Sequence, residues 1–333
     1  MRAPEFWDGR PGFIAGLLAP VGAALDAAGR LRRAVVRPYR APVPVICVGN
    51  LVTGGSGKTP VALSLAAILI GRGIETAIVT RGYGGRLTGP VRVDPLLHDA
   101  DAVGDEALLA AAQTMCWVAA DRAAGVRAAV AAGAAAVILD DGFQNPHVAK
   151  DLSLVVVDAG YGFGNCRLIP AGPLRERIAD GLERADAVVL IGDDGPAPRQ
   201  LVPSSRPVLR AALAPLDGDR FAGVASVAFA GIGRPEKFFA TLRGSGARLV
   251  AQHGFPDHHR YRAGELAALR REAAAAGASL VTTAKDWIRL PPDERADIAV
   301  LDVELRWRDK TALDALLTPL FVRNSDDRRA VYG

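Results

Sequence analysis

Short apolar runs rich in valine and isoleucine alternate along this chain with alanine- and leucine-rich segments of helical length. Most of these runs are apolar at every position, which is typical of strands buried on both faces of a parallel sheet. The pattern therefore predicts an α/β fold with a mostly parallel sheet. The predicted strands of the first part begin at Val45 and then occupy 76–80, 115–119, 136–141, 154–158 and 187–191, with helices at 61–70, 107–112 and 121–132.

The alternation pauses at 192–207, a stretch rich in Asp, Gly, Pro and Ser, and then starts again. Because a chain of 333 residues is near the size limit of a single core, we expect two domains. They are predicted at 41–206 and 207–330, the second being a smaller α/β domain, after an N-terminal segment at 1–40. The predicted strands of the second domain are 224–230, 248–252, 279–283 and 298–303, and its helices are 235–242 and 265–276.

The N-terminal segment contains an apolar stretch at 13–25 that glycine and proline interrupt. It is too short to span a bilayer. A signal peptide would carry its positive charge before the apolar run, whereas here most of it comes after, and no convincing cleavage site follows. A cluster of arginines follows it: Arg30, Arg32, Arg33, Arg37 and Arg40. From this segment alone two interpretations stay open, a helix lying on an anionic membrane surface and a core-packing helix with a solvated basic end.

Composition limits the class of protein. Hydrophobic residues make up 50% of the chain and charged residues 23%, which indicates a globular chain and excludes a disordered one. The net charge is only +4, so the arginine cluster is a local feature. Cys47, Cys116 and Cys166 are scattered without a CxxC motif, and we expect reduced thiols in a cytosolic protein.

The strongest chemical motif follows the first predicted strand and is typical of a nucleotide-binding phosphate loop. In such a loop Lys58 reaches the β- and γ-phosphates of a nucleoside triphosphate, and the Thr59 hydroxyl binds Mg²⁺. The strict motif has glycine where this chain has Val52, so the loop is a variant, and a chance match in a turn is the alternative. The predicted ATP-binding residues are Thr53, Gly54, Gly55, Ser56, Gly57, Lys58 and Thr59.

Carboxylates occur at further positions where a phosphate-loop enzyme uses them. Asp140 and Asp141 end the predicted strand 136–141, as the residues that hold Mg²⁺ do in such enzymes. Asp105 opens a short predicted helix, where capping of the helix N-terminus is the ordinary alternative.

Polar loops follow other predicted strands. A glycine-rich loop with Arg81 and Tyr83 comes after 76–80, and its position at a strand end favours a ligand-facing role. Histidines gather at 253–259, where a catalytic or phosphate-contacting role is favoured over zinc binding because no other ligands cluster there. The polar segment 282–286 also ends a strand and could face the same cleft.

Taken in order, these motifs resemble those of one protein family. They are PEFWDGR, GNLVTGGSGKTP, TRGYGG, VGDE, DDGFQ, RLIPAGPLRE, FPDHH and TTAKD, and they extend along nearly the whole chain. A phosphate loop is generic, whereas DDGFQ, PAGPLRE and FPDHH at this spacing are specific. The chain thus resembles the tetraacyldisaccharide 4'-kinases, the lipid A 4'-kinases of Gram-negative bacteria.

The resemblance implies an activity and a location. The activity is phosphorylation, with ATP and Mg²⁺, of the 4'-hydroxyl of an acylated glucosamine disaccharide 1-phosphate, which gives lipid IVA in lipid A (lipopolysaccharide) biosynthesis. The implied fold is a phosphate-loop NTPase core with a second, smaller α/β domain and a membrane-associated N-terminal helix. The implied location is the cytoplasmic face of the inner membrane, so the resemblance favours the anionic membrane surface for the N-terminal segment.

The resemblance also implies roles for individual residues. Asp105 would take the proton of the sugar hydroxyl, assisted by His258 of the other domain, so that domain closure would assemble the site. If Asp105 is only a helix cap, Asp141 is the next candidate for the base. The remaining implied residues are Lys58 and Arg122 as catalytic groups, Thr59, Asp140 and Asp141 as metal ligands, and Asn50, Tyr83, Gln144 and Glu176 as substrate-binding residues.

Some assignments stay open in the sequence. His258 is favoured over His259 because it follows Asp257, and the sequence does not distinguish Asp140 from Asp141 as the metal ligand. Asn145-Pro146-His147 stand where a His-Arg-like pair is usual in the family, so this loop lacks a basic residue at its usual place.

Two other classes of phosphate-loop protein fit the sequence less well. A switch or partitioning ATPase usually has a lysine just before the two glycines, where this chain has Thr53. A nucleic-acid-binding NTPase would interleave aromatic residues with its arginines, and the cluster at 30–40 has little such interleaving. We therefore expect a kinase that is monomeric and binds no nucleic acid.

Overall fold

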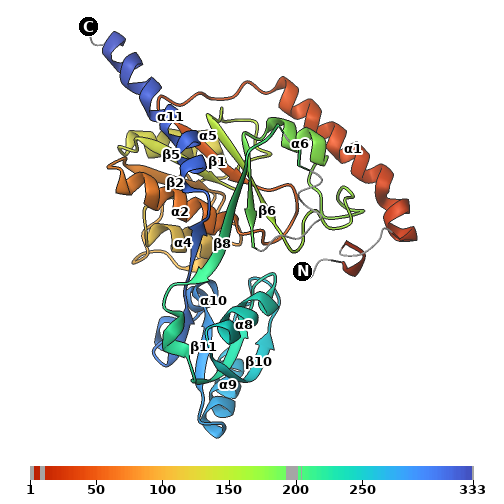
Figure 1. Ribbon diagram of the computed structural model, residues 1–333, viewed down its shortest axis with the longest axis vertical. Helices are drawn as coiled ribbons and strands as arrows, with labels where there is room; N and C mark the ends of the chain where they lie inside the picture. The colour runs from red at the N-terminus through yellow and green to blue at the C-terminus, as the bar shows by residue number, and fades with distance from the viewer. Residues whose placement is uncertain (1–3, 8–11, 193–201, 204, 332–333) are drawn as a thin grey trace.

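The computed structural model describes residues 4–7, 12–192, 202–203 and 205–331 of the 333-residue chain. Its strands form a nine-stranded and a four-stranded sheet, which belong to a larger and a smaller part of the molecule. Figure 1 shows the smaller part below the larger one, with helix α1 along one outer side and helix α11 on the opposite side. The expected α/β fold with a mostly parallel sheet is confirmed.

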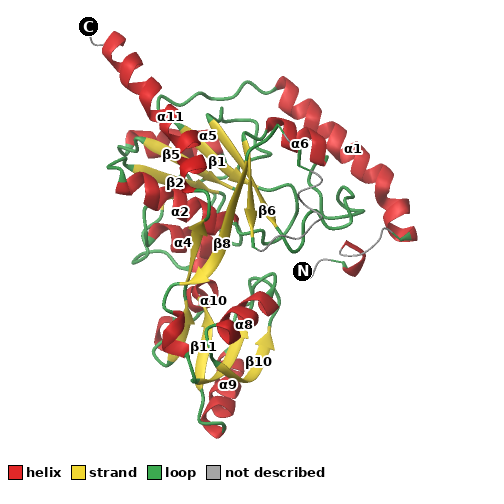
Figure 2. Cartoon of the chain, in the orientation of Figure 1, coloured by secondary structure: helices red, strands yellow, loops and turns green. Residues whose placement is uncertain are grey.

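The larger sheet has the strand order β13-β8-β7-β6-β1-β5-β2-β4-β3. Figure 2 shows its strands with helices around them. Its strands are parallel except at the two edges, where β13 runs antiparallel to β8 and β3 antiparallel to β4. The strands are β1 (Val45–Gly49), β2 (Thr76–Thr80), β3 (Val91–Arg92), β4 (Met115–Val118), β5 (Ala136–Asp140), β6 (Leu152–Asp158), β7 (Ala187–Ile191), β8 (Val208–Pro215) and β13 (Val303–Trp307).

Helices cover both faces of this sheet. Because side chains alternate along a strand, Ile46 and Val48 of β1 enter one core, and Val45 and Cys47 enter the other. Burial on both faces explains why the run is apolar at every position. The first core also contains side chains of α2 (Lys58–Gly71), α3 (Ala100–Val103), α4 (Asp105–Ala111) and α11 (Lys310–Val331), and the second contains those of α5 (Arg122–Ala131) and α6 (Ile178–Arg184).

The smaller part has a four-stranded parallel sheet of order β10-β9-β11-β12. Helix α8 packs on one face of this sheet and α9 on the other. Its strands are β9 (Ala225–Ala230), β10 (Arg248–Gly254), β11 (Ser279–Thr283) and β12 (Ile298–Leu301), and its helices are α8 (Pro235–Gly244), α9 (Ala263–Ala275) and α10 (Ala284–Arg289). Short 3-10 helices lie at η1 (Glu5–Trp7), η2 (Gly218–Phe221) and η3 (Pro292–Glu294).

The strands are shared between the two parts in a way that the sequence did not indicate. The domain division at 206/207 stays a prediction, but β8 and β13 lie on the C-terminal side of it and pair in the larger sheet. The predicted strand 298–303 is divided at Asp302 between β12 and β13, which belong to different sheets. Most of the expected linker at 192–207 lies outside the described residues.

Helix α1 (Phe13–Val35) extends beyond the apolar stretch at 13–25 and includes the first arginines. It is long and apolar enough to cross a membrane by length and composition, and only 17% of its most apolar window is buried. The core-packing interpretation is therefore wrong, because one face of the helix is an exposed apolar stripe. The stripe consists of Phe13, Ile14, Leu17, Val21, Leu25, Leu31 and Val35.

The assignment of β13 to the larger sheet predicts where its side chains contribute stability. Trp307 is 7% exposed, packs in the larger core and donates a hydrogen bond from Nε1 to Ser64 Oγ at 2.8 Å. We expect Trp307→Ala to lower the free energy of unfolding by roughly 3–5 kcal/mol, measured by urea denaturation. Val303→Ala, at a 43% exposed position of the same strand, should cost under about 1 kcal/mol. Equal effects of the two variants would contradict this packing.

Candidate functional site

The predicted phosphate loop connects β1 to α2, as the sequence indicated. Gly57 precedes the helix with a φ of 87°, a left-handed conformation that favours glycine, and α2 begins at Lys58. Asn50 is fully buried and donates to Ser56 Oγ at 2.9 Å, which ties the start of the loop to its end. Val52 is buried and pairs with Leu174, so the residue that replaces the usual glycine has a packing role.

Thr53 has a different environment from the rest of the predicted ATP-binding segment. Its backbone N–H donates to the carbonyl oxygen of Pro173 at 2.9 Å, and its hydroxyl points to the same oxygen at 3.4 Å. In this conformation Thr53 fixes the loop to the segment before Arg175 and has no N–H to offer a phosphate. Its assignment to ATP binding stays a prediction.

Thr59 and Asp140 meet where the helix faces the end of β5. The Thr59 hydroxyl donates to Asp140 Oδ2 at 3.1 Å, and Asp140 Oδ1 is buried without a hydrogen-bond partner among the described residues. Burial, followed by the negative charge of Glu106, raises the pKa of Asp140 to about 7. An unpaired buried carboxylate oxygen beside a hydroxyl is a donor set that suits Mg²⁺.

Asp141 has different partners from Asp140. It accepts a hydrogen bond from Arg175 Nη1 at 2.7 Å and lies 3.9 Å from Lys58 Nζ. Its φ of 56° turns it away from the direction of the strand. No group of three or more His, Cys, Asp or Glu side chains in the described part of the chain could hold a metal ion by itself. A Mg²⁺ ion here would therefore also need ligands from the nucleotide, which is usual for this ion.

Asp105 and His258 lie together, although they belong to different parts of the molecule. Gly104, not Asp105, is the N-cap of α4, and Asp105 makes no capping hydrogen bond, so the helix-cap interpretation is wrong. Asp105 is 3% exposed, and its Oδ2 lies 3.3 Å from His258 Nδ1. His258 has a φ of 57° and donates its backbone N–H to the carbonyl oxygen of Gly231 at 3.0 Å.

Charge compensation decides the protonation of this pair. Burial alone raises the pKa of Asp105, but the hydrogen bond with His258 and the charge of Arg289 outweigh burial and hold this pKa well below its ordinary value. The hydrogen bond to Asp105 raises the pKa of His258 above its ordinary value. At neutral pH the carboxyl is therefore ionised, and the imidazole is the group better able to hold a proton.

His259 and Tyr83 lie near this pair in different ways. The His259 ring stacks on Phe255 at 4.7 Å between ring centroids, and its Nε2 lies 3.0 Å from Glu265 Oε2. Tyr83 is 68% exposed, and its ring lies 5.2 Å from that of His258, at the rim of the site. The contact with Asp105 is therefore made by His258 and not by its neighbour.

Gln144 and Glu176 form a second cluster behind the phosphate loop. Gln144 Nε2 donates to the carbonyl oxygen of Asn50 at 2.8 Å and to Glu176 Oε1 at 3.0 Å. Glu176 is 1% exposed and also accepts from Arg184 at 2.9 Å, while Arg33 of α1 lies 3.5 Å away. In this conformation the buried Glu176 links the loop of Gln144 to α6 and α1 through hydrogen bonds and ion pairs. Its contact with substrate stays a prediction.

Two basic residues complete the surroundings of the site. Arg122 is 4% exposed at the first turn of α5, where its Nη1 donates to the carbonyl oxygen of Ala119 at 2.5 Å. Lys150 donates from Nζ to the carbonyl oxygens of Phe143 at 2.9 Å and Asn145 at 2.8 Å. Lys150 thus fixes the loop in which Asn145-Pro146-His147 stand where the family usually has a His-Arg-like pair.

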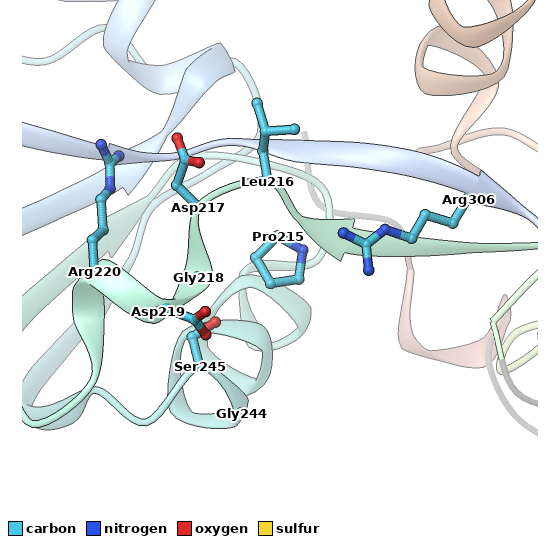
Figure 3. A pocket seen from close by; sticks show the side chains of 9 residues that line it. All are labelled: Pro215, Leu216, Asp217, Gly218, Asp219, Arg220, Gly244, Ser245 and Arg306. Atoms are coloured by element: carbon cyan, nitrogen blue, oxygen red, sulfur yellow. The ribbon is translucent and has the colours of Figure 1, made fainter.

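Sequence reasoning missed Arg289, which donates to Asp105 from Nε at 3.0 Å and also from Nη2. No pattern in the sequence points to Arg289, because the short helix α10 that carries it was not predicted. A cavity of about 650 Å³ lies elsewhere, where β8 leaves the larger sheet (Figure 3), and no predicted site residue lines it. Its lining is Pro215, Leu216, Asp217, Gly218, Asp219, Arg220, Gly244, Ser245 and Arg306.

Comparisons with known proteins agree on one family. The profile described as "Tetraacyldisaccharide-1-P 4'-kinase" matches residues 14–321. The tetraacyldisaccharide 4'-kinase of Rhodospirillum centenum is 52% identical over 99% of this chain and 100% of its own, and that of Dinoroseobacter shibae is 54% identical over 96% and 98%. The crystal structure of LpxK from Aquifex aeolicus in complex with ATP is 26% identical, with a TM-score of 0.76 over 93% of this chain and 100% of that one.

The contact between Asp105 and His258 can be tested without substrate. Asp105→Asn removes the negative charge that stabilises the imidazolium, so we expect the pKa of His258 to fall. An NMR titration of ring-labelled histidines in the full-length protein measures this shift. His259, which pairs with Glu265 and does not contact Asp105, is the internal control, and its ring signals should be the same in the variant and the parent. An unchanged His258 would contradict the contact.

Proposed function

Because this chain belongs to the tetraacyldisaccharide-1-P 4'-kinase family, we propose that it transfers the γ-phosphoryl group of ATP to the 4'-hydroxyl of tetraacyldisaccharide 1-phosphate, giving lipid IVA in lipid A biosynthesis. The observation that carries the proposal is the pairing of Asp105 with His258 across two parts of a phosphate-loop protein. The family match does not favour the alternative class, a switch or partitioning ATPase.

The phosphate loop binds ATP through its backbone N–H groups and the N-terminus of α2. Burial lowers the pKa of Lys58, with a smaller contribution in the same direction from the charge of Arg175, and the charge of Asp141 opposes this change. Lys58 therefore reaches the β- and γ-phosphates as a cation held beside Asp141. Arg122 adds positive charge that acts on Asp141.

The residues present fit Mg²⁺, which would be held by the Thr59 hydroxyl and the unpartnered Oδ1 of Asp140. When bound, the ion neutralises charge on the β- and γ-phosphates. Asp141 serves this site indirectly, because its carboxylate already holds Arg175 and Lys58 in place. Asp140 is therefore the metal ligand and Asp141 the positioning residue.

Proton removal from the sugar hydroxyl uses Asp105 and His258 together. Asp105 Oδ1 is buried and has no partner among the described residues, whereas Oδ2 is occupied by Arg289 and His258. The hydroxyl donates to Oδ1 and is aligned with the γ-phosphorus, and the proton leaves as the new O–P bond forms. Since the pKa of Asp105 is low and that of His258 is raised, the imidazole is where the proton comes to rest.

The test of this function is phosphate transfer by the purified protein. We expect ATP and the disaccharide 1-phosphate to give a product with a phosphate at the 4' position, identified by mass spectrometry and NMR. Lys58→Ala should lower kcat on the order of a hundredfold or more, because a fixed charge on the transferring group is lost. The exposed Lys310→Ala is the matched control and should leave kcat unchanged. Transfer by Lys58→Ala within a few-fold of the parent would refute this role.

The apolar stripe of α1 supports a place on the membrane, at the cytoplasmic face where such a lipid is made. Arg33 faces inward and lies 3.5 Å from Glu176, and the half-exposed Arg30 lies 3.8 Å from Asp180 of α6. These arginines hold the helix to the body of the protein, and the apolar side chains are the groups that enter the lipid. Oligomeric state and the absence of nucleic acid binding stay predictions.

Vesicle binding tests the stripe. We expect the double variant Leu17→Ser, Leu25→Ser to lower partitioning into anionic vesicles by roughly tenfold per side chain, because each apolar side chain is worth about 1.5 kcal/mol or more when buried. Co-sedimentation at moderate salt measures the effect. Leu96→Ser, Leu97→Ser is the control, since these residues are 94% and 80% exposed away from α1. If both double variants bind alike, α1 is not the membrane contact.

A further inference from the structure

Arg289 occupies the centre of the contact between the two parts of the molecule. It is the last residue of α10, and its side chain is 6% exposed. On one side its Nε and Nη2 donate to Oδ2 of Asp105 in the larger part. On the other side its Nη1 donates to the carbonyl oxygen of Gly231 at 2.7 Å and to Asp286 Oδ1 at 3.0 Å.

The smaller part holds this guanidinium through Asp286. Asp286 is fully buried and accepts hydrogen bonds from the backbone N–H of Gly231 at 2.9 Å, the Tyr261 hydroxyl at 2.8 Å and the Thr283 hydroxyl at 2.6 Å. A carboxylate with this many donors has a fixed orientation. The position of Arg289 is therefore set by the smaller part, whereas its main partner belongs to the larger part.

We propose that Arg289 is a positioning residue for phosphoryl transfer, which holds Oδ2 of Asp105, so that Oδ1, buried and without a partner among the described residues, is the oxygen that accepts the acceptor hydroxyl when substrate is bound. The inference rests on the proposed function and adds a residue to its proton-transfer machinery. Two N–H groups of one rigid guanidinium converge on Oδ2 and fix the position of that oxygen, which the single rotating ammonium of a lysine does less well. Because the grip reaches across the two parts, Asp105 is held in this orientation only while they are in contact.

The charged groups around Asp105 determine how removal of Arg289 would change the pKa values of Asp105 and His258. Asp105 faces Arg289 of α10 and His258 of the following loop, and Lys285 and Glu106 lie beside it as a pair. Asp257, Asp286, Tyr261 and Tyr83 are the other titratable groups around His258 and Arg289. The positive charge of Arg289 lowers the pKa of both Asp105 and His258. Removal of Arg289 raises both pKa values, so Asp105 and His258 reach their deprotonated forms only at higher pH.

The test compares Arg289→Gln and Arg289→Lys with Arg260→Gln. Arg260 is a matched control because it also crosses between the parts, to Asp101 at 2.8 Å, but its side chain is 73% exposed and does not contact Asp105. We expect Arg289→Gln to lower kcat on the order of a hundredfold, because a misplaced reacting group costs about this much. The KM for both substrates should change little, and Arg260→Gln should behave as the parent.

The pH profile separates a positioning role from support of the fold. In Arg289→Gln the acidic limb of the pH profile of kcat should move to higher pH, because the charge that lowered the pKa values of Asp105 and His258 is absent. In Arg289→Lys the charge is kept, so the limb should stay in place while kcat lies between those of the parent and Arg289→Gln. A loss of kcat without any shift of the limb in Arg289→Gln would overturn the proposal, and so would parent-like kcat in both variants.

Two further measurements keep the outcome decisive. Folding of each variant is checked by thermal unfolding and by ATP binding. If Arg289→Gln does not fold, Arg289→Lys decides, because it retains the buried charge: an unchanged kcat overturns the proposal, and a lowered kcat with unchanged KM supports it. If the parent itself transfers no phosphate, the proposed function fails. The His258 titration in Arg289→Gln, which should move upward relative to the parent, then still tests the contact.

Discussion

The complete burial of β1 between two layers of helices is the constraint on which the site depends. Because β1, β5 and β6 are parallel neighbours, their carboxyl ends lie at one edge of the sheet. The phosphate loop therefore leaves β1 beside Asp140 of β5 and Asp158 of β6. The fit is so close that a Cβ on Gly49 would lie 2.4 Å from that of Phe143, so only glycine can end this strand. The same burial that stabilises the core thus brings the phosphate loop next to carboxylates.

The contact between the two parts is made largely of charged groups. Asp158 at the end of β6 accepts from Arg234 at 3.0 Å and also pairs with Lys237, both from the smaller part. Arg289 and Lys285 make equivalent pairs with Asp105 and Glu106. Charged surfaces can separate in water without exposing an apolar core. Such a contact would suit the closure of the two parts over ATP and lipid, which stays a prediction.

The sequence predicted those features that depend on short stretches of chain. The apolar runs gave β1, β2 and β7 with their observed extents or nearly so, and the loop at Lys58 and the acid at Asp140 followed from their positions at strand ends. Features that depend on distant partners were missed. The strand β13 is short and begins directly after β12, so its apolar residues give no sign that they return to the other sheet. Arg289 is similar, because only the fold places it next to Asp105.

The return of β13 to the larger sheet has a consequence for synthesis of the chain on the ribosome. Strand β8 is complete long before β13 exists, and the whole of the smaller part is made between them. During that time β8 presents an unpaired edge, and the part of α2 that contacts Trp307 lacks its cover. The larger part can therefore finish folding only when the last segment of the chain has emerged, although it contains the first strand made. Such late closure by distant segments slows folding and leaves the nascent chain open to aggregation.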